Sequence, residues 1–551
     1  MTKVIGKVSA TEKNPSTVDE FYFWTDKQQI LSPFDVVKVC HSEGSTTYGI
    51  VEEINHVTDA PSHMSSFISS DFGDTGAEIG NMDRLGINYV RARVSSNTGG
   101  IYTPVLNGSP VALCDADDIK RALGLTDADV KNPLVCGYLD MYGGRGEQER
   151  QRIKVSLNSH FVVGPDGAHL NVSGISGLAA KTSYSMFLLR AMQQTTTDCA
   201  FVLFNVKGRD LLAIDEPNDE LTDEDRKIYE ELGLDGRPFA NVRYLYPYSA
   251  ATGKSIQSYA STEDFERQQQ LGKAKRYKFV YENNKENLDL LLAEEDDSTG
   301  TMEACVNTVM NGGGSFSGID SWRRLKEKLD EKSRAGGGGD AKEISVMSWR
   351  KFNRLVKKAI TNDIFSKDIF EERGEVELSD HLGESLRKGE VAVVDIANLD
   401  AKTQSFVFGS VVKSIYEAKL EGEREDMPQR IVIFVDELNK YASSDVPRNS
   451  PILRQLLDIA ERGRSLGIIL FSVEQFRSAI HERVKGNCST HAYGRTNAVE
   501  VSKPDYRYIP KTYQNMMTRL APGEYIVSNP ALRSLINIKF PRPAYRQFPN
   551  G

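Results

Sequence analysis

Five consecutive large apolar residues, Ile431–Val435, are followed at once by two carboxylates, Asp436 and Glu437. A run without alternation of apolar and polar side chains fits a strand that is covered on both faces of its sheet. Three other short segments have the character of buried strands: Ala200–Val206, Glu390–Ile396 and Ile468–Ser472. Helix-type sequence separates most of these segments, and this alternation predicts an α/β fold with a parallel sheet.

A turn rich in glycine and alanine lies between a β-type segment and Tyr184–Met192, which carries apolar residues at helical spacing. Backbone N–H groups, a lysine and a hydroxyl at a helix start are the groups that hold a phosphate chain and its Mg²⁺. The alternative is an ordinary connection between a strand and a helix. The predicted phosphate-binding residues are Gly174, Ser176, Gly177, Leu178, Ala179, Ala180, Lys181, Thr182 and Ser183.

This turn departs twice from the phosphate-loop pattern G-x-x-x-x-G-K-[ST]. Gly174 lies one position too far from Lys181, and Ala180 stands where the pattern has a glycine. Alanine fits this position if the local φ is negative, but it does not easily adopt a positive φ. We therefore expect ATP binding with a modified loop geometry.

Strand-end residues supply the second half of the predicted site. Asp436 is suited to hold Mg²⁺ together with Thr182, and Glu437 is suited to polarise the attacking water. The alternative for the two carboxylates is a solvent-exposed strand end. Gln475, just past the next apolar strand, is suited to sensing the γ-phosphate. Arg464 is suited to stabilising charge in the transition state, although an arginine at a helix end is often a cap.

The length of 551 residues exceeds the size at which single cores stop growing, so several domains are expected. Short β-type runs separated by turns near the start read as a small barrel. The central span is charged and helix-prone, and we read it as an insertion looped out of the sheet. The expected parts are an N-terminal β-barrel at 1–125, the first part of a RecA-like ATPase domain with the phosphate loop at 126–214, a mostly helical insertion at 215–381, and the second part of the ATPase domain with a C-terminal extension at 382–551.

Charge, cysteine content and hydropathy narrow the class of protein. The formal net charge of -9 argues against a protein coated with nucleic acid, but a local basic channel stays open. The six cysteines form no C-x-x-C pair, so we expect reduced thiols and no structural metal. No signal peptide or membrane-spanning run is evident, which predicts a soluble, cytoplasmic chain. Aromatic and basic residues around Trp322 and Trp349 fit either DNA contacts or solvated helix faces.

Taken together, these motifs resemble those of a HerA-type ATPase of the HerA/FtsK superfamily. The resemblance runs nearly from end to end of the chain. The N-terminal region is similar to that family's HAS barrel in Phe34–Val39 and Tyr48–Ile54. The further matching segments are the Lys181 loop, Lys207-Gly208, Val435-Asp436-Glu437, Gly463-Arg464, Gln475, Asn487-Cys488-Ser489-Thr490 and Leu520-Ala521-Pro522-Gly523-Glu524.

What the resemblance implies is an ATP-hydrolysing DNA translocase or helicase that assembles as a homohexamer with DNA in its central channel. ATP sites would lie at subunit interfaces, with Mg²⁺ as the metal. Such a motor would work with a separate nuclease, NurA-like, or with a sirtuin-like effector, in DNA-end processing or antiviral defence. The alternative is a ring-shaped nucleotide-binding scaffold that assembles and regulates an effector with little motor activity.

The resemblance also implies individual roles. Lys181 would hold the β- and γ-phosphates, Thr182 and Asp436 the Mg²⁺, and Glu437 the attacking water. Gln475 would sense the γ-phosphate. Arg464 would approach the phosphates near that sensor, with Arg462 and Arg495 as its rivals.

Overall fold

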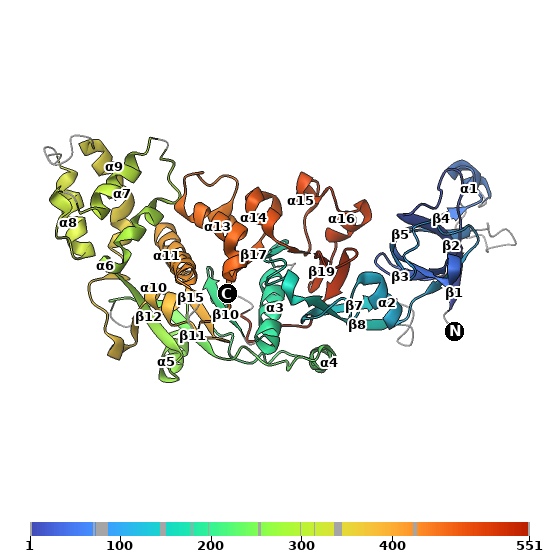
Figure 1. Cartoon of the computed structure of the whole chain (residues 1–551), viewed down its shortest axis with the longest axis horizontal. Helices are drawn as coiled ribbons and strands as arrows, with labels where there is room; N and C mark the ends of the chain where they lie inside the picture. The colour runs from blue at the N-terminus through green and yellow to red at the C-terminus, as the bar shows by residue number, and fades with distance from the viewer. Residues whose placement is uncertain are drawn as a thin grey trace. The chain divides into compact units, whose positions relative to one another are not determined.

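The computed structural model describes residues 3–69, 72, 86–143, 150–177, 180–196, 198–251, 255–297, 299–312, 314–334, 344–422 and 427–548. The chain divides into two compact units, and Figure 1 labels most of their helices and many of their strands. The barrel unit comprises residues 1–158 and 495–540, and the sheet unit comprises residues 159–494 and 541–551. The first boundary therefore lies at 158/159 instead of the expected 125/126, and residues 495–540 group with the barrel and not with the ATPase domain.

The N-terminal barrel is closed and antiparallel, with strand order β1-β2-β5-β4-β3-β6. Alternate side chains of its strands point inward, and Phe21 and Phe23 are fully buried. This architecture confirms the small β-barrel expected at the start of the chain. The strands are β1 (Val4–Val8), β2 (Glu20–Asp26), β3 (Val36–Cys40), β4 (Thr46–Thr58), β5 (Gly86–Asn97) and β6 (Pro110–Leu113).

The described residues of the barrel unit also form an antiparallel strand series, β19-β20-β7-β8, and four short helices. Helix α2 begins with a capping box between Asp115 and Asp118 and ends at Gly124, whose φ of 76° suits glycine. The strands are β7 (Pro133–Met141), β8 (Gln151–Asn158), β19 (Glu524–Ser528) and β20 (Ile536–Lys539). The helices are α1 (His63–Ser69), α2 (Ala116–Leu123), α15 (Ala498–Val501) and α16 (Lys511–Met517).

The sheet unit is built on strands in the order β13-β12-β11-β15-β10-β16-β17-β9-β18, and each neighbouring pair is parallel. The fold is therefore α/β with a parallel sheet, as the apolar runs predicted. The strands are β9 (Leu170–Ser173), β10 (Cys199–Asn205), β11 (Val242–Pro247), β12 (Ala274–Val280), β13 (Phe365–Ser366), β14 (Glu375–Glu377), β15 (Val391–Asp395), β16 (Arg430–Asp436), β17 (Ile468–Glu474) and β18 (Thr490–Tyr493).

Helices cover both faces of this sheet. One hydrophobic core joins α11 and α13 to alternate residues of the central strands, among them Val202 and Ile433. The residues between them, such as Phe201 and Val432, are equally buried and face the other way, the side on which α3 packs. The helices are α3 (Lys181–Thr195), α4 (Asp223–Leu232), α5 (Thr262–Gln270), α6 (Tyr281–Asn284), α7 (Thr301–Met310), α8 (Trp322–Lys332), α9 (Val346–Ile360), α10 (Leu378–Glu384), α11 (Ala401–Leu420), α12 (Asn439–Ala442), α13 (Pro451–Leu466) and α14 (Glu482–Asn487).

The span 215–381 differs from the expected helical insertion. It carries α4 to α9, but β11 and β12 within it pair in parallel next to β15 and extend the sheet. Strand β12 was not evident from the sequence because it contains charged residues. One of them, Lys278, is buried in an ion pair with Glu375 at 2.5 Å. Among the described residues, no helix has both the length and the apolar character needed to cross a bilayer.

Candidate functional site

Strands β9, β16 and β17 bring their carboxyl ends to one edge of the sheet. The register pairs Asp436 of β16 with Val473 of β17, and Glu474 of β17 with Ser173 of β9. The loop that follows Ser173 leads into α3, which begins at Lys181. This edge, called the nucleotide edge below, therefore gathers the strand-end carboxylates and a helix start, which is where ligands of parallel α/β sheets bind.

Lys181 lies at the first position of α3 and its side chain is 7% exposed. Its Nζ donates a hydrogen bond to Ser176 Oγ at 3.1 Å, so the ammonium group reaches back across its own loop. Burial lowers the pKa of Lys181, and the nearby Asp436 carboxylate opposes this shift. The lysine is thus held at the nucleotide edge in a position to meet a phosphate.

Three of the described loop residues have a positive φ. Gly174 and Gly177 have φ values of 154° and 78°, and Ala180 has φ 49° and ψ 41°. Ala180 therefore adopts the positive φ that alanine does not easily adopt, at a cost of about 1–2 kcal/mol. Two predicted loop residues, Leu178 and Ala179, lie outside the described residues, and Ser183 lies in the first turn of α3.

Thr182 lies beside Asp436, and Glu437 follows Asp436 at the end of β16. Thr182 Oγ1 donates to Asp436 Oδ2 at 3.1 Å, which brings the hydroxyl and the carboxylate within reach of one cation. The Glu437 backbone N–H donates to Val473 O at 2.8 Å and to Asp436 Oδ1 at 2.9 Å. Glu437 itself has a φ of 59° and a side chain that is 55% exposed. A left-handed glutamate at a strand end is backbone strain of the kind that accompanies functional sites.

Lys207, which follows β10, is a site residue to which the sequence reasoning gave no role. Its Nζ lies 3.4 Å from Asp436 Oδ2 and 3.6 Å from Glu437 Oε1. Burial lowers the pKa of Lys207, but attraction by these two carboxylates outweighs it and the net pKa is raised. Lys207 therefore stays charged and balances the carboxylates. The signal available in the sequence was the Lys-Gly pair directly after an apolar strand.

Glu474, the last residue of β17, is a second group that the sequence reasoning missed. It is fully buried, and its Oε1 accepts a hydrogen bond from Asn171 Nδ2. Its backbone carbonyl accepts from the Gly174 N–H at 3.2 Å, at the start of the phosphate loop. Burial raises the pKa of Glu474 to about 8, so the carboxyl group is neutral at pH 7. A neutral, buried acid thus lies under the loop.

Arg477 lies beneath the same edge. Its Nη1 donates to Asn171 Oδ1 at 3.0 Å and contacts His491 Nδ1 at 2.8 Å. Burial, with a contribution from Arg477, lowers the pKa of His491 to about 3, so His491 is neutral and accepts this bond. Asn171 therefore connects Arg477 to Glu474 and fixes the end of β9, from which the phosphate loop begins.

The remaining two predicted residues lie at opposite edges of the sheet. Gln475 directly follows Glu474 and is exposed at the nucleotide edge. Arg464 precedes β17, and its Nη1 donates to Asp166 O at 3.1 Å, ahead of β9. Seven strand residues at about 3.3 Å each separate the two ends of β17. Arg464 is therefore absent from the nucleotide edge of its own chain.

In the aromatic and basic stretches of the middle span, the tryptophans have a structural role. Trp322 and Trp349 are 3% and 2% exposed and belong to the core. The neighbouring Arg323 and Arg324 form ion pairs with acidic residues four positions away, Glu327 at 3.1 Å and Asp320 at 3.3 Å. Base stacking on these tryptophans is excluded, and the solvated-face interpretation fits the basic residues better.

Comparisons with known proteins give structural similarities alone. No family model and no curated protein matches the sequence. The unbound bacterial conjugative coupling protein TrwBΔN70 is 12% identical, with 71% of this chain and 89% of that chain covered and a TM-score of 0.43. VirB4 of Thermoanaerobacter pseudethanolicus is 14% identical, with 74% and 96% covered and a TM-score of 0.44. The genome packaging NTPase B204 of Sulfolobus turreted icosahedral virus 2 is 15% identical, with 30% of this chain and 72% of that chain covered and a TM-score of 0.23.

The geometry of the sheet unit defines its class. A glycine-containing loop follows β9, Lys181 and Thr182 open the next helix, and Asp436 ends a central strand beside them. This is the arrangement of a RecA-like P-loop NTPase domain. The fold class is therefore α/β and RecA-like, with an N-terminal small β-barrel.

Proposed function

We propose that this chain is the subunit of an ATP-hydrolysing, DNA-translocating motor of the HerA type within the HerA/FtsK superfamily. The observation that carries the proposal is the meeting of Lys181, Thr182, Asp436 and Glu437 at one edge of the sheet. These four residues come from segments more than 200 positions apart in the sequence, so their meeting depends on the fold. Each has the chemistry that nucleotide hydrolysis requires at its place.

The residues present fit a nucleotide with Mg²⁺. Lys181 would neutralise the β- and γ-phosphates, and from the first position of α3 its Nζ reaches Ser176 in the preceding loop. The Thr182 hydroxyl and the Asp436 carboxylate are oxygen donors of the type Mg²⁺ prefers, and they already face each other at 3.1 Å. The metal would supply charge neutralisation at the phosphates. Glu437, exposed beside Asp436, would take the proton of the attacking water.

Further parts of the proposal rest on the family resemblance. They are a homohexameric ring, DNA in its central channel, Gln475 as γ-phosphate sensor, and a separate nuclease or sirtuin-like effector in antiviral defence or DNA-end processing. Because Arg464 lies at the edge opposite Lys181, it would act only on the nucleotide of a neighbouring subunit. Arg462 and Arg495 are the alternatives for that role.

A ring-shaped scaffold that binds nucleotide without turning it over rapidly is the second candidate. Two observations favour it: Ala180 replaces glycine at a left-handed position, and Lys207 pairs with both Asp436 and Glu437. A lysine on the catalytic carboxylates holds the water-activating base in an ion pair. Such a protein would assemble an effector with nucleotide as a structural ligand.

Steady-state ATP hydrolysis with and without double-stranded DNA, with mass determined in parallel, separates the candidates. A motor should turn over faster with DNA, and Glu437→Gln should lower its rate by about 10²–10⁴-fold because a general base is lost. Glu230→Gln, on the exposed face of α4, is the matched control and should keep the wild-type rate. A ring with negligible turnover under every condition would favour the scaffold. Full activity in Lys181→Ala would contradict both the site and the motor.

A further inference from the structure

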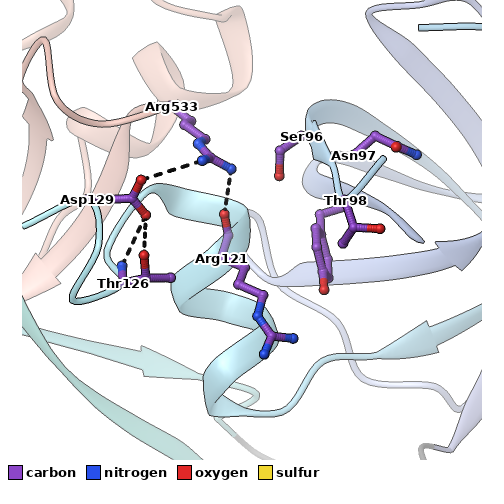
Figure 2. A pocket seen from close by; sticks show the side chains of 8 residues that line it. Ser96, Asn97, Thr98, Arg121, Thr126, Asp129 and Arg533 are labelled. Atoms are coloured by element: carbon purple, nitrogen blue, oxygen red, sulfur yellow. Dashed lines mark hydrogen bonds and ion pairs between the residues drawn. The ribbon is translucent and has the colours of Figure 1, made fainter. Parts of the chain in front are cut away.

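The barrel unit holds a polar cavity of about 470 Å³ that the nucleotide site does not use (Figure 2). Helix α2 and the turn after it form one side, and the end of β5 forms the other. Arg533, from the segment between β19 and β20, completes the lining. All of these elements belong to one compact unit, so the cavity is a feature of the barrel unit itself.

Arg533 is fixed at this cavity by two contacts. Its Nη1 donates to the Arg121 carbonyl at 2.8 Å, and its Nη2 lies 3.6 Å from Asp129 Oδ1. Asp129 is also used internally, because its Oδ2 accepts from the Thr126 hydroxyl at 2.5 Å and from the Thr126 N–H at 3.3 Å. Figure 2 shows these contacts running from the Arg121 carbonyl through Arg533 and Asp129 to Thr126. The guanidinium is thus held in a defined orientation with its charge only partly balanced.

Arg121 supplies a second cation, whose charge is less well balanced by carboxylates than that of Arg533. Its guanidinium lies against the Tyr48 hydroxyl, and within the part of the chain that the structure describes it has no carboxylate within ion-pair distance. The nearby Asp118 is engaged elsewhere, since it accepts from Tyr48 Oη at 2.8 Å and pairs with Lys38. Two arginines and one carboxylate therefore face the cavity, which leaves it with net positive charge.

A hydroxyl donor completes the lining. Thr98 Oγ1 accepts from the Thr46 N–H at 2.9 Å, so its own hydrogen is free to point into the cavity. Ser96 also lines the cavity, but its Oγ is buried, so Thr98 is the hydroxyl that a ligand would meet.

We propose that this cavity binds a phosphate group carried by a ligand of about nucleotide size. A guanidinium pairs with two oxygens of a carboxylate or of a phosphate, and a phosphate has further oxygens that can accept from the Thr98 hydroxyl. A second cavity of about 410 Å³ shares Ser96, Asn97 and Arg533 with the first and provides room for the rest of the ligand. Asp19 lines that second cavity and disfavours another phosphate there. The ligand therefore carries a single phosphate group.

The proposal is independent of ATP hydrolysis, because no residue of the cavity belongs to the sheet unit. Its test must nevertheless silence the phosphate loop, which also binds phosphate. The full chain with Lys181→Ala serves as the background, and phosphorus NMR titration with inorganic phosphate and with AMP reports binding. Malonate, a dicarboxylate of similar charge, tests whether phosphate is the preferred group.

In that background, Arg121→Gln is expected to weaken binding of phosphate and of AMP by about tenfold or more, since a charge-assisted hydrogen bond is lost. Thr98→Val, which removes the hydroxyl donor and leaves the charges intact, should weaken it about threefold. Arg323→Gln, on an exposed helix face, is the control and should change nothing. The proposal is overturned if the background binds no phosphate, if Arg121→Gln and Thr98→Val bind as the background does, or if malonate binds more tightly than phosphate.

Discussion

Replacing the buried acid beneath the phosphate loop should change how stability depends on pH. Glu474 is fully buried, and burial raises its pKa to about 8 from the ordinary value of 4.5. Between these two pH values the folded protein keeps the proton and the unfolded chain releases it. Folded Glu474 therefore binds more protons than unfolded Glu474, and stability falls as the pH rises from 4.5 to about 8. Glu474→Gln removes this loss, because glutamine never ionises and its Oε1 can still accept from Asn171.

The size of the effect follows from the same pKa. One pKa unit corresponds to about 1.4 kcal/mol, so a rise from 4.5 to about 8 is worth about 5 kcal/mol above pH 8. Complete burial means that solvent screening does not reduce this figure substantially. At about 2 °C per kcal/mol for a domain of this size, the wild-type melting temperature should fall by about 10 °C more than that of Glu474→Gln between pH 5 and pH 8.5. At pH 5 the two proteins should melt close together.

Thermal unfolding followed by circular dichroism at several pH values, without nucleotide, measures this difference. Glu377→Gln is a matched comparator, since burial also raises the pKa of Glu377 to about 8, and its carboxylate bonds to Val280 and Asn284 instead. It should flatten the pH dependence in the same direction. Parallel curves for wild type and Glu474→Gln across this range would refute the reasoning, because they would mean that Glu474 ionises in the folded protein.

Two further substitutions test the nucleotide edge. Ala180→Gly relieves about 1–2 kcal/mol of left-handed strain and costs about 0.4–1 kcal/mol through a more flexible unfolded chain, so the melting temperature should change little. ATP affinity should rise severalfold in an equilibrium titration. Unchanged affinity would show that the strain at Ala180 does not affect ATP binding. Lys207→Gln removes the cation that competes for Asp436, so Mg²⁺ should stabilise the protein at concentrations about threefold lower or more in a melting assay, whereas weaker Mg²⁺ binding would place Lys207 among the groups that support the metal.

The parallel strands could be predicted because their sequences are almost entirely apolar. Each of β10, β15, β16 and β17 is buried on both faces, and such strands are nearly continuous in apolar residues. Once they are placed in one parallel sheet, their carboxyl ends must share an edge. The shared edge, together with the loop motif that precedes Thr182, brings Thr182 to Asp436 across more than 200 residues of sequence.

The rest of the fold could not be predicted from the sequence, because some of its buried residues are charged and are stabilised by ion pairs with distant residues. Lys278 in β12 is 3% exposed, and only its partner Glu375, far along the chain, makes that burial tolerable. A lysine in a strand signals a solvated face unless the partner is known. The same holds for Glu474, since a glutamate at the end of an apolar run reads as a strand terminus, whereas the structure encloses it beneath Gly174.

Arg464 shows how closeness in sequence to a functional strand misleads. Its place just before β17, whose far end carries Glu474 and Gln475, predicts a role near the phosphates. The amino and carboxyl ends of a seven-residue strand lie about 20 Å apart, so a residue before the strand belongs to the opposite edge of the sheet. Arg477, which follows the strand, is the arginine that the described chain brings beneath the loop. In a parallel sheet, side chains that serve a site at the carboxyl edge must therefore be sought after the strands and not before them.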